Sequence, residues 1–122
     1  MYCGPTLRVK ANDVVPMAPA GHIHGTFELR LGARLLAYVE ETGRGVAMVG
    51  EVGIYTSRDP DTVRGADALV ISHERYGRRG PGAFLDIAPE LVVEILSPED
   101  RPGEVETKIR EYLSIGVDRV WL

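Results

Sequence analysis

The clearest periodic pattern along the chain predicts a helix from His24 to about Thr42. Its apolar residues recur at spacings of four, four, three and one, which places them on one face of an α-helix. These residues are Phe27, Leu31, Leu35, Tyr38 and Val39. Gly43 and Gly45 follow the pattern, and glycine readily adopts the left-handed backbone that ends a helix. The pattern therefore predicts one long helix with one buried face.

The residues before this helix predict extended structure followed by a loop. Leu7–Lys10 alternates apolar and polar side chains, as a half-buried strand does. Val14-Val15 predicts a second extended piece. Pro16, Pro19 and Gly21 then interrupt regular structure.

The second half of the chain predicts strands with one late helix. The expected strands are 45–57, 66–72, 91–96 and 117–122, and an exposed loop rich in Gly, Pro and Arg is expected at 76–89. Pro102 suits the first position of a helix that extends to about Ser114. Its core-facing residues are expected to be Val105, Ile109, Tyr112 and Leu113. The late strand–helix–strand order predicts a crossover unit, and the whole pattern an α/β fold with a mixed sheet flanked by helices.

The length of 122 residues and the hydrophobic content of 44% fit one ordinary domain that spans residues 1–122. The sequence contains no run of eighteen apolar residues and no charged start followed by an apolar stretch, so neither a membrane span nor an export signal is expected. We therefore expect a cytoplasmic protein. The single cysteine, Cys3, excludes an internal disulfide and a cysteine-based zinc site.

The net charge of −4 counts against a dedicated nucleic-acid binder, which usually carries a basic face. It is compatible with an enzyme whose acidic residues gather around a divalent cation. Composition alone does not indicate a nuclease.

Glu94 is the most informative polar residue, because it lies within the otherwise apolar run Leu91–Leu96. A strand that is apolar on both faces is buried on both faces. An ionised carboxylate in such a place costs several kcal/mol unless a cation or a proton compensates. Glu94 is therefore paired with a basic side chain, protonated or bound to a metal; the alternative is a position near the strand end from which it reaches solvent.

Asp67 and Lys108 are the other two candidates. Asp67 stands either at the head of the short strand 68–71 or at the end of a turn that begins at Gly65. If the two strands pair, Asp67 and Glu94 can present carboxylates to one hard divalent cation such as Mg²⁺. Lys108 borders the buried face of the late helix, where an ammonium can orient a water or stabilise charge on a phosphate. The alternative for Lys108 is a stem that covers apolar surface while its head reaches water.

Two further groups of residues carry weaker signals. His22 and His24 are expected in a loop just before the first helix, and no third ligand is obvious, which disfavours a zinc site. A basic and aromatic cluster lies at the start of the predicted loop and is made of Arg75, Tyr76, Arg78 and Arg79. This cluster either contacts phosphates or is simply a solvated arginine loop.

The run Ala88–Pro98, followed by Lys108, Tyr112, Gly116-Val117 and Trp121-Leu122, resembles the Uma family of restriction-endonuclease-like proteins. This family belongs to the PD-(D/E)XK nuclease superfamily. Two upstream segments also fit the family pattern, namely 17–21 together with His24, and Arg64–Asp67. The resemblance covers nearly the whole chain from about Leu7.

The resemblance implies a restriction-endonuclease-like mixed β-sheet and a Mg²⁺- or Mn²⁺-dependent endonuclease that hydrolyses nucleic-acid phosphodiester bonds, with DNA the first candidate substrate. Asp67 matches the first acidic residue of the superfamily motif and Glu94 the second. Both would bind the metal together with the backbone carbonyl of Ile95. Leu96 stands where the lysine of the ordinary motif lies, so its role would pass to Lys108 on the following helix; His24 would be an accessory residue.

The chain also departs from the family pattern. Ala66 replaces the proline of the signature, and Glu90 stands where aspartate is commoner. The stretch before Met17 lacks the Glu-rich strand of many relatives, and the C-terminus comes early, so the domain looks short at both ends. A homodimer would cover a core edge that a missing segment leaves open. The short length, the negative charge and the lack of an obvious basic groove favour the alternative of a non-catalytic interaction module that keeps the nuclease fold.

Overall fold

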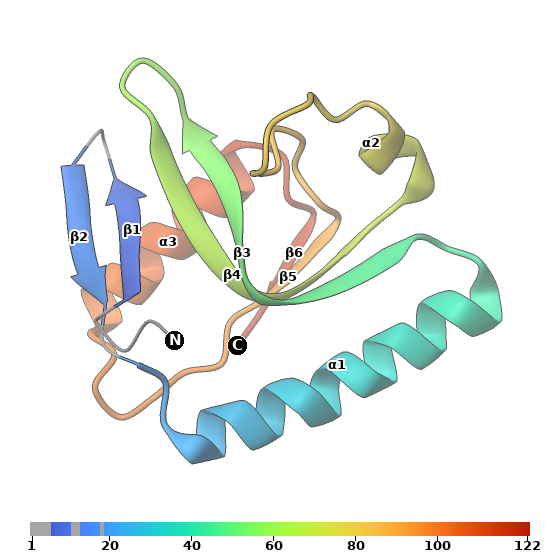
Figure 1. Cartoon of the computed structure of the whole chain (residues 1–122), viewed down its shortest axis with the longest axis horizontal. Coiled ribbons are helices and arrows are strands. Elements are labelled where there is room, and N and C mark those ends of the chain that lie inside the picture. Colours follow the sequence, from blue (N-terminus) through green and yellow to red (C-terminus); the bar gives the residue numbers. More distant parts are fainter. Residues whose placement is uncertain (1–5, 11–12, 18) are drawn as a thin grey trace.

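A computed structural model describes residues 6–10, 13–17 and 19–122, which form a mixed six-stranded sheet with helices packed against it (Figure 1). The strands are β1 (Thr6–Lys10), β2 (Asp13–Met17), β3 (Val46–Ser57), β4 (Thr62–Ile71), β5 (Leu91–Val93) and β6 (Arg119–Trp121). The helices are α1 (His22–Thr42), α2 (His73–Gly77) and α3 (Pro102–Ser114). The sheet order is β2-β1-β4-β5-β6, and β3 pairs with β4. The predicted α/β class and mixed sheet are confirmed.

The long antiparallel hairpin of β3 and β4 is the centre of the sheet, with pairing from Val46↔Ile71 to Ser57↔Thr62. The prediction of a short strand over 66–72 was wrong at its start, because β4 begins at Thr62. The first half of the strand was not predicted, because the charged Arg64 and the adjacent Gly65 are atypical of a buried strand. Arg64 is nevertheless buried, since its guanidinium forms an ion pair with Glu111 on α3. Asp67 therefore lies inside a long strand and does not begin or end one.

α1 ends where predicted but begins at His22, two residues before the predicted start, and part of its predicted buried face was wrong. Leu35 and Val39 are buried, whereas the side chains of Phe27 and Tyr38 are 58% and 47% exposed. The inward face continues toward the N-terminus through two polar residues, His24 and Glu28, which are half-buried. A search for apolar spacing alone misses a stripe whose first members are polar. No helix of the described part of the chain combines the length and the apolarity that a membrane crossing requires.

Two apolar clusters hold the layers together. Leu35 of α1 packs with Ala68 of β4 and Val93 of β5. The larger cluster includes Tyr112 of α3 and Val92 of β5. Alternate residues of β5 thus contact different clusters, as the two-residue period of a strand requires.

β5, α3 and β6 form the predicted crossover unit, because β5 and β6 pair in parallel through Val92↔Val120. The helix runs over Pro102–Ser114 as expected, and Tyr112 is fully buried. Leu113 was wrongly placed in the core, since its side chain is 49% exposed. One residue along a helix turns the side chain by about 100°, so Tyr112 and Leu113 cannot share the buried face.

The region expected to be an exposed loop at 76–89 overlaps the short helix α2, whose first turn is capped by the Ser72 hydroxyl. The Arg75 side chain is partly buried. Its guanidinium donates to the carbonyls of Ala88 and Gly116 and pairs with Asp118. The guanidinium of Arg79 stacks over the Tyr76 ring at 3.7 Å. Of the two alternatives for this cluster, a purely solvated arginine loop was wrong for Arg75, which ties α2 to the strand connections around it.

Replacing Gly45 with alanine is expected to destabilise the fold by about 2 kcal/mol or more, in the range of strained backbone and steric clashes. Gly45 has a φ of 131°, and an added Cβ would lie 2.3 Å from the carbonyl oxygen of Ile71. Urea unfolding measures the change. The matched control is Gly25→Ala on α1, where an added Cβ meets no atom within 4 Å. Equal stability of the two variants would contradict the placement of Gly45.

Candidate functional site

The pairing of β4 with β5 brings Asp67 and Glu94 together. These strands are antiparallel with Ala68 opposite Val93, so the next position of the same register places Asp67 opposite Glu94. Both residues are buried, at 6% and 7% exposure. Like charges directly opposite each other destabilise a sheet, and burial increases the penalty. Asp67 and Glu94 can face one cation only if these two strands pair, and they do pair. The opposed carboxylates lower the stability of the fold.

A β-bulge lies directly across from Asp67. β3 places Gly50 and Glu51 opposite this single residue, between the pairs Val49↔Ala68 and Val52↔Ala66. Gly50 and Glu51 have φ angles of 96° and 58°, and the latter is unusual for a residue with a side chain. Bulges re-aim neighbouring side chains and occur often beside active sites.

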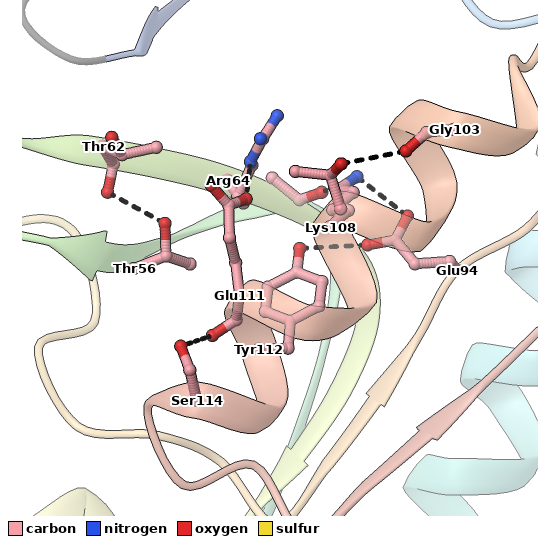
Figure 2. Close-up of polar contacts among 11 residues, drawn as sticks. Thr56, Thr62, Arg64, Glu94, Gly103, Lys108, Glu111, Tyr112 and Ser114 are labelled. Carbon is pink, nitrogen blue, oxygen red and sulfur yellow. Dashed lines mark hydrogen bonds and ion pairs between the residues drawn. The ribbon is translucent and has the colours of Figure 1, made fainter.

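Glu94 follows the last residue of β5 and reaches toward α3, as Figure 2 shows. Its two carboxylate oxygens accept hydrogen bonds from the Lys108 ammonium and from the Tyr112 hydroxyl, each at 3.0 Å. The ammonium of Lys108 also donates to the carbonyl of Gly65 at 3.0 Å. Of the alternatives left open by the sequence, the structure shows Glu94 as a buried carboxylate paired with a basic side chain, with only 7% of the residue exposed. Lys108 has its ammonium inside the site and not in open water.

Burial dominates the ionisation of this group. It raises the pKa of Glu94 from 4.5 to about 7, against the charge and hydrogen bond of Lys108, and the charge of Asp67 adds to the increase. Burial also raises the pKa of the Tyr112 phenol far above its ordinary value, which keeps this hydroxyl a donor. The site thus holds a carboxylate whose charge is poorly compensated at neutral pH.

Asp67 is held by groups from two other segments. Its Oδ2 accepts the backbone N–H of Ile95 at 2.7 Å, and its Oδ1 lies 3.2 Å from Nε2 of His24. The expectation that His22 and His24 lie in a loop was wrong, because both are in the first turn of α1. His22 is exposed, whereas His24 is half-buried against Asp67, so the two histidines do not act as a pair.

Glu28 is the site residue that sequence reasoning missed. One ligand atom from each of His24, Glu28 and Asp67 lies within 4.8 Å of the others, a group that could hold a metal ion. The signal was present in the sequence, since Glu28 follows His24 by four residues, which places both on one helix face. The role of Tyr112 was also missed, because it was assigned only to the core.

One cleft with a volume of about 950 Å³ lies beside these groups. Asp67, Glu94, Ile95 and Lys108 line it, together with His24. The three side chains proposed from the sequence therefore open onto a common space, whereas the arginines of the 75–79 segment do not line it.

The donor set suits a hard divalent cation. A carboxylate offers about four lone-pair sites, and each carboxylate of the pair uses two of them in the contacts described above. Free lone pairs therefore remain on both Asp67 and Glu94, and two buried carboxylates face the single ammonium of Lys108. Mg²⁺ binds through one or two carboxylates plus waters, which matches what the cleft provides.

Comparisons with known proteins agree with this architecture. The sequence profile of Uma2, described as a putative restriction endonuclease family, matches residues 4–122. A crystal structure of a putative nuclease belonging to DUF820, from Anabaena variabilis, superposes with a TM-score of 0.73 at 20% sequence identity. The superposition covers 97% of this chain and 65% of that one, so the chain spans about two thirds of its structural relative. No curated protein matches the sequence.

The profile match extends over almost the entire chain, and the fold is that of a nuclease-like relative. The chain belongs to the Uma2 family of restriction-endonuclease-like proteins.

Proposed function

We propose that the protein is a divalent-metal-dependent nuclease that hydrolyses phosphodiester bonds in the cleft between α1, the β4–β5 edge and α3. The observation that carries the proposal is the pair of buried carboxylates, Asp67 on β4 and Glu94 directly after the paired strand β5, with the Lys108 ammonium beside them. A structural role alone does not account for such a pair, because like charges opposed in a sheet reduce stability. Membership of a family of restriction-endonuclease-like proteins supports the same reaction class.

Asp67 and Glu94 would hold the ion, Mg²⁺ or Mn²⁺, with the carbonyl of Ile95 as the further proposed ligand. A bound ion of this kind neutralises phosphate charge and lowers the pKa of a coordinated water. The chain's own groups fix the carboxylates in advance: Ile95 N–H orients Asp67, and Tyr112 orients Glu94. Such preorganisation removes the cost of arranging ligands when the ion and substrate bind.

Lys108 would act on the substrate side of the site. Its contacts with Glu94 and the Gly65 carbonyl hold the ammonium at the cleft wall. From there it can stabilise negative charge that develops on the phosphate or orient the attacking water. In the usual motif the lysine lies two residues after the second acidic residue, where this chain has Leu96. Lys108 on α3, fourteen residues after Glu94, would take the role of that lysine.

The direct test incubates the purified protein with single- and double-stranded DNA and RNA, in Mg²⁺, in Mn²⁺ or in a chelator. Cleavage of at least one polymer only when an ion is present is expected, and Lys108→Met should reduce it by about 100-fold or more. The control is Arg110→Met, an exposed residue of the same helix that pairs with the exposed Glu106. Cleavage that persists in chelator would contradict the metal dependence.

A non-catalytic interaction module is the second candidate function, favoured by the net charge of −4. An inert scaffold should cleave none of the four polymers and should show no ion binding that depends on Asp67 and Glu94. That combination of results would replace the nuclease proposal with the module.

A further inference from the structure

The inward face of α1 changes character along its length. Toward the C-terminus it is apolar, with Leu35 and Val39 buried against the sheet. In the first two turns the half-buried positions are His24 and Glu28, while Ile23 and Phe27 are more than half exposed. An amphipathic helix normally turns apolar residues inward, so an inward histidine and glutamate need a polar partner.

His24 has such a partner in Asp67, whose side chain is only 8% exposed and lies 3.2 Å away. Glu28 brings a second carboxylate to the same place, and a cation would compensate the two charges. His24 and Glu28 share one helix face, and ligand atoms of all three residues lie within 4.8 Å of one another. An ion with bonds of about 2.1 Å spans opposite ligands about 4.2 Å apart. Small rotations of the side chains therefore suffice to close the three ligands around one ion.

The charge of the cleft supports more than one ion. Six carboxylates and three Lys or Arg side chains line it, and Glu28 beside Asp67 brings the excess to four negative charges when all carboxylates are ionised and His24 is neutral. One divalent ion would leave half of this excess, and a polyanionic backbone would still be repelled. Two divalent ions would neutralise it.

We infer that His24, Glu28 and Asp67 form a second divalent-ion site, next to the proposed Asp67–Glu94 site, and that this second site prefers a transition-metal ion such as Mn²⁺ over Mg²⁺. The preference comes from the imidazole of His24, since nitrogen ligands suit transition metals while Mg²⁺ takes oxygen ligands. Asp67 is the ligand common to both sites. The inference deepens the proposed nuclease function and rests on it for its role, but ion binding can be measured without any cleavage.

A simpler role for His24 is to orient Asp67 by their contact at 3.2 Å. Under that role Glu28 contributes nothing to ion binding. Glu28 therefore separates the two explanations, because it does not line the cleft that contains Glu94 and Lys108.

The experiment is a Mn²⁺ titration of the full chain by calorimetry, with melting by circular dichroism to show that each variant is folded. The wild type should bind two Mn²⁺ ions. Glu28→Gln should weaken one of them by about tenfold or more, at least as much as changes to an outer-shell partner do, and leave the other unchanged. Glu40→Gln, an exposed residue of the same helix, is the matched control. Two ions bound with unchanged affinity in Glu28→Gln, or a single ion in the wild type that is indifferent to Glu28, would overturn the inference.

A spectroscopic readout tests the histidine separately. Electron spin echo modulation of bound Mn²⁺ should show coupling to an imidazole nitrogen in the wild type and in His22→Ala, and none in His24→Ala. Coupling that survives in His24→Ala would also overturn the inference. Nuclease assays on the same samples keep the two proposals distinct. If ions bind at this site but no polymer is cleaved, only the proposed nuclease function is contradicted. If a polymer is cleaved but Glu28→Gln does not change ion binding, only the second ion site is contradicted.

Discussion

Replacing Asp67 with asparagine is expected to lower the rate of ion-dependent phosphodiester cleavage by about 1000-fold, the upper range for loss of one electrostatic group in an active site. Asparagine keeps the shape of the side chain and an oxygen that can accept the Ile95 N–H. It removes the negative charge that both proposed ion sites share. The fold should therefore persist while the site loses its cation, and initial cleavage rates at saturating Mn²⁺ measure the loss.

The matched control is Asp118→Asn, since Asp118 has a side chain that is 55% exposed and pairs with Arg75 outside the cleft. This variant should cleave at the wild-type rate. Equal activity of Asp67→Asn and the wild type would remove Asp67 from the chemistry.

Replacing Glu94 with glutamine is expected to stabilise the ion-free protein at pH 8 by up to about 3 kcal/mol while it abolishes cleavage. The reason is the pKa of Glu94, which burial raises from 4.5 to about 7. Between these two values the folded state holds a proton that the unfolded state has lost. Folding stability of the wild type should therefore fall as pH rises from about 4.5 to about 7 and level off above that range.

Urea unfolding in chelator at pH 5 and pH 8 measures the stability gained in Glu94→Gln and the pH dependence of stability in the wild type. Glu94→Gln cannot ionise at this position, so its advantage over the wild type should be largest at pH 8 and small at pH 5. Glu106→Gln, on the exposed side of α3, is the control and should follow the wild type at both pH values. A constant difference between Glu94→Gln and the wild type across pH would show that Glu94 does not titrate as its burial requires.

The sequence predicted elements well where one local rule decides them. The extent of α1 follows from its apolar spacing and the glycines after it, and the start of α3 from Pro102. The parallel pairing of β5 and β6 follows from the handed crossover through α3. Local rules failed where tertiary partners compensate, as for Arg64, which is buried in β4 and paired with Glu111 of α3.

The candidate site was partly within reach of the sequence for the same reason. The apolar neighbours of Glu94 signalled a buried carboxylate, and the helical spacing of Lys108 placed it at the edge of the core. That Asp67 lies opposite Glu94 depends on the register of β4 with β5, which no local pattern fixes. The contacts of Asp67 with His24 and Glu28 depend on the packing of α1 over the sheet. The homodimer, the single-domain extent and the cytoplasmic location stay predictions.

The most direct measurement is a Mg²⁺ titration of four proteins by calorimetry at pH 7.5: the wild type, Asp67→Asn, Glu94→Gln and Asp118→Asn. The wild type and Asp118→Asn are expected to bind the ion with the same affinity. Each of the other two should bind it at least about tenfold more weakly, because each loses one of two carboxylates that face the same ion. Equal Mg²⁺ affinity in all four proteins would contradict a shared cation site at Asp67 and Glu94.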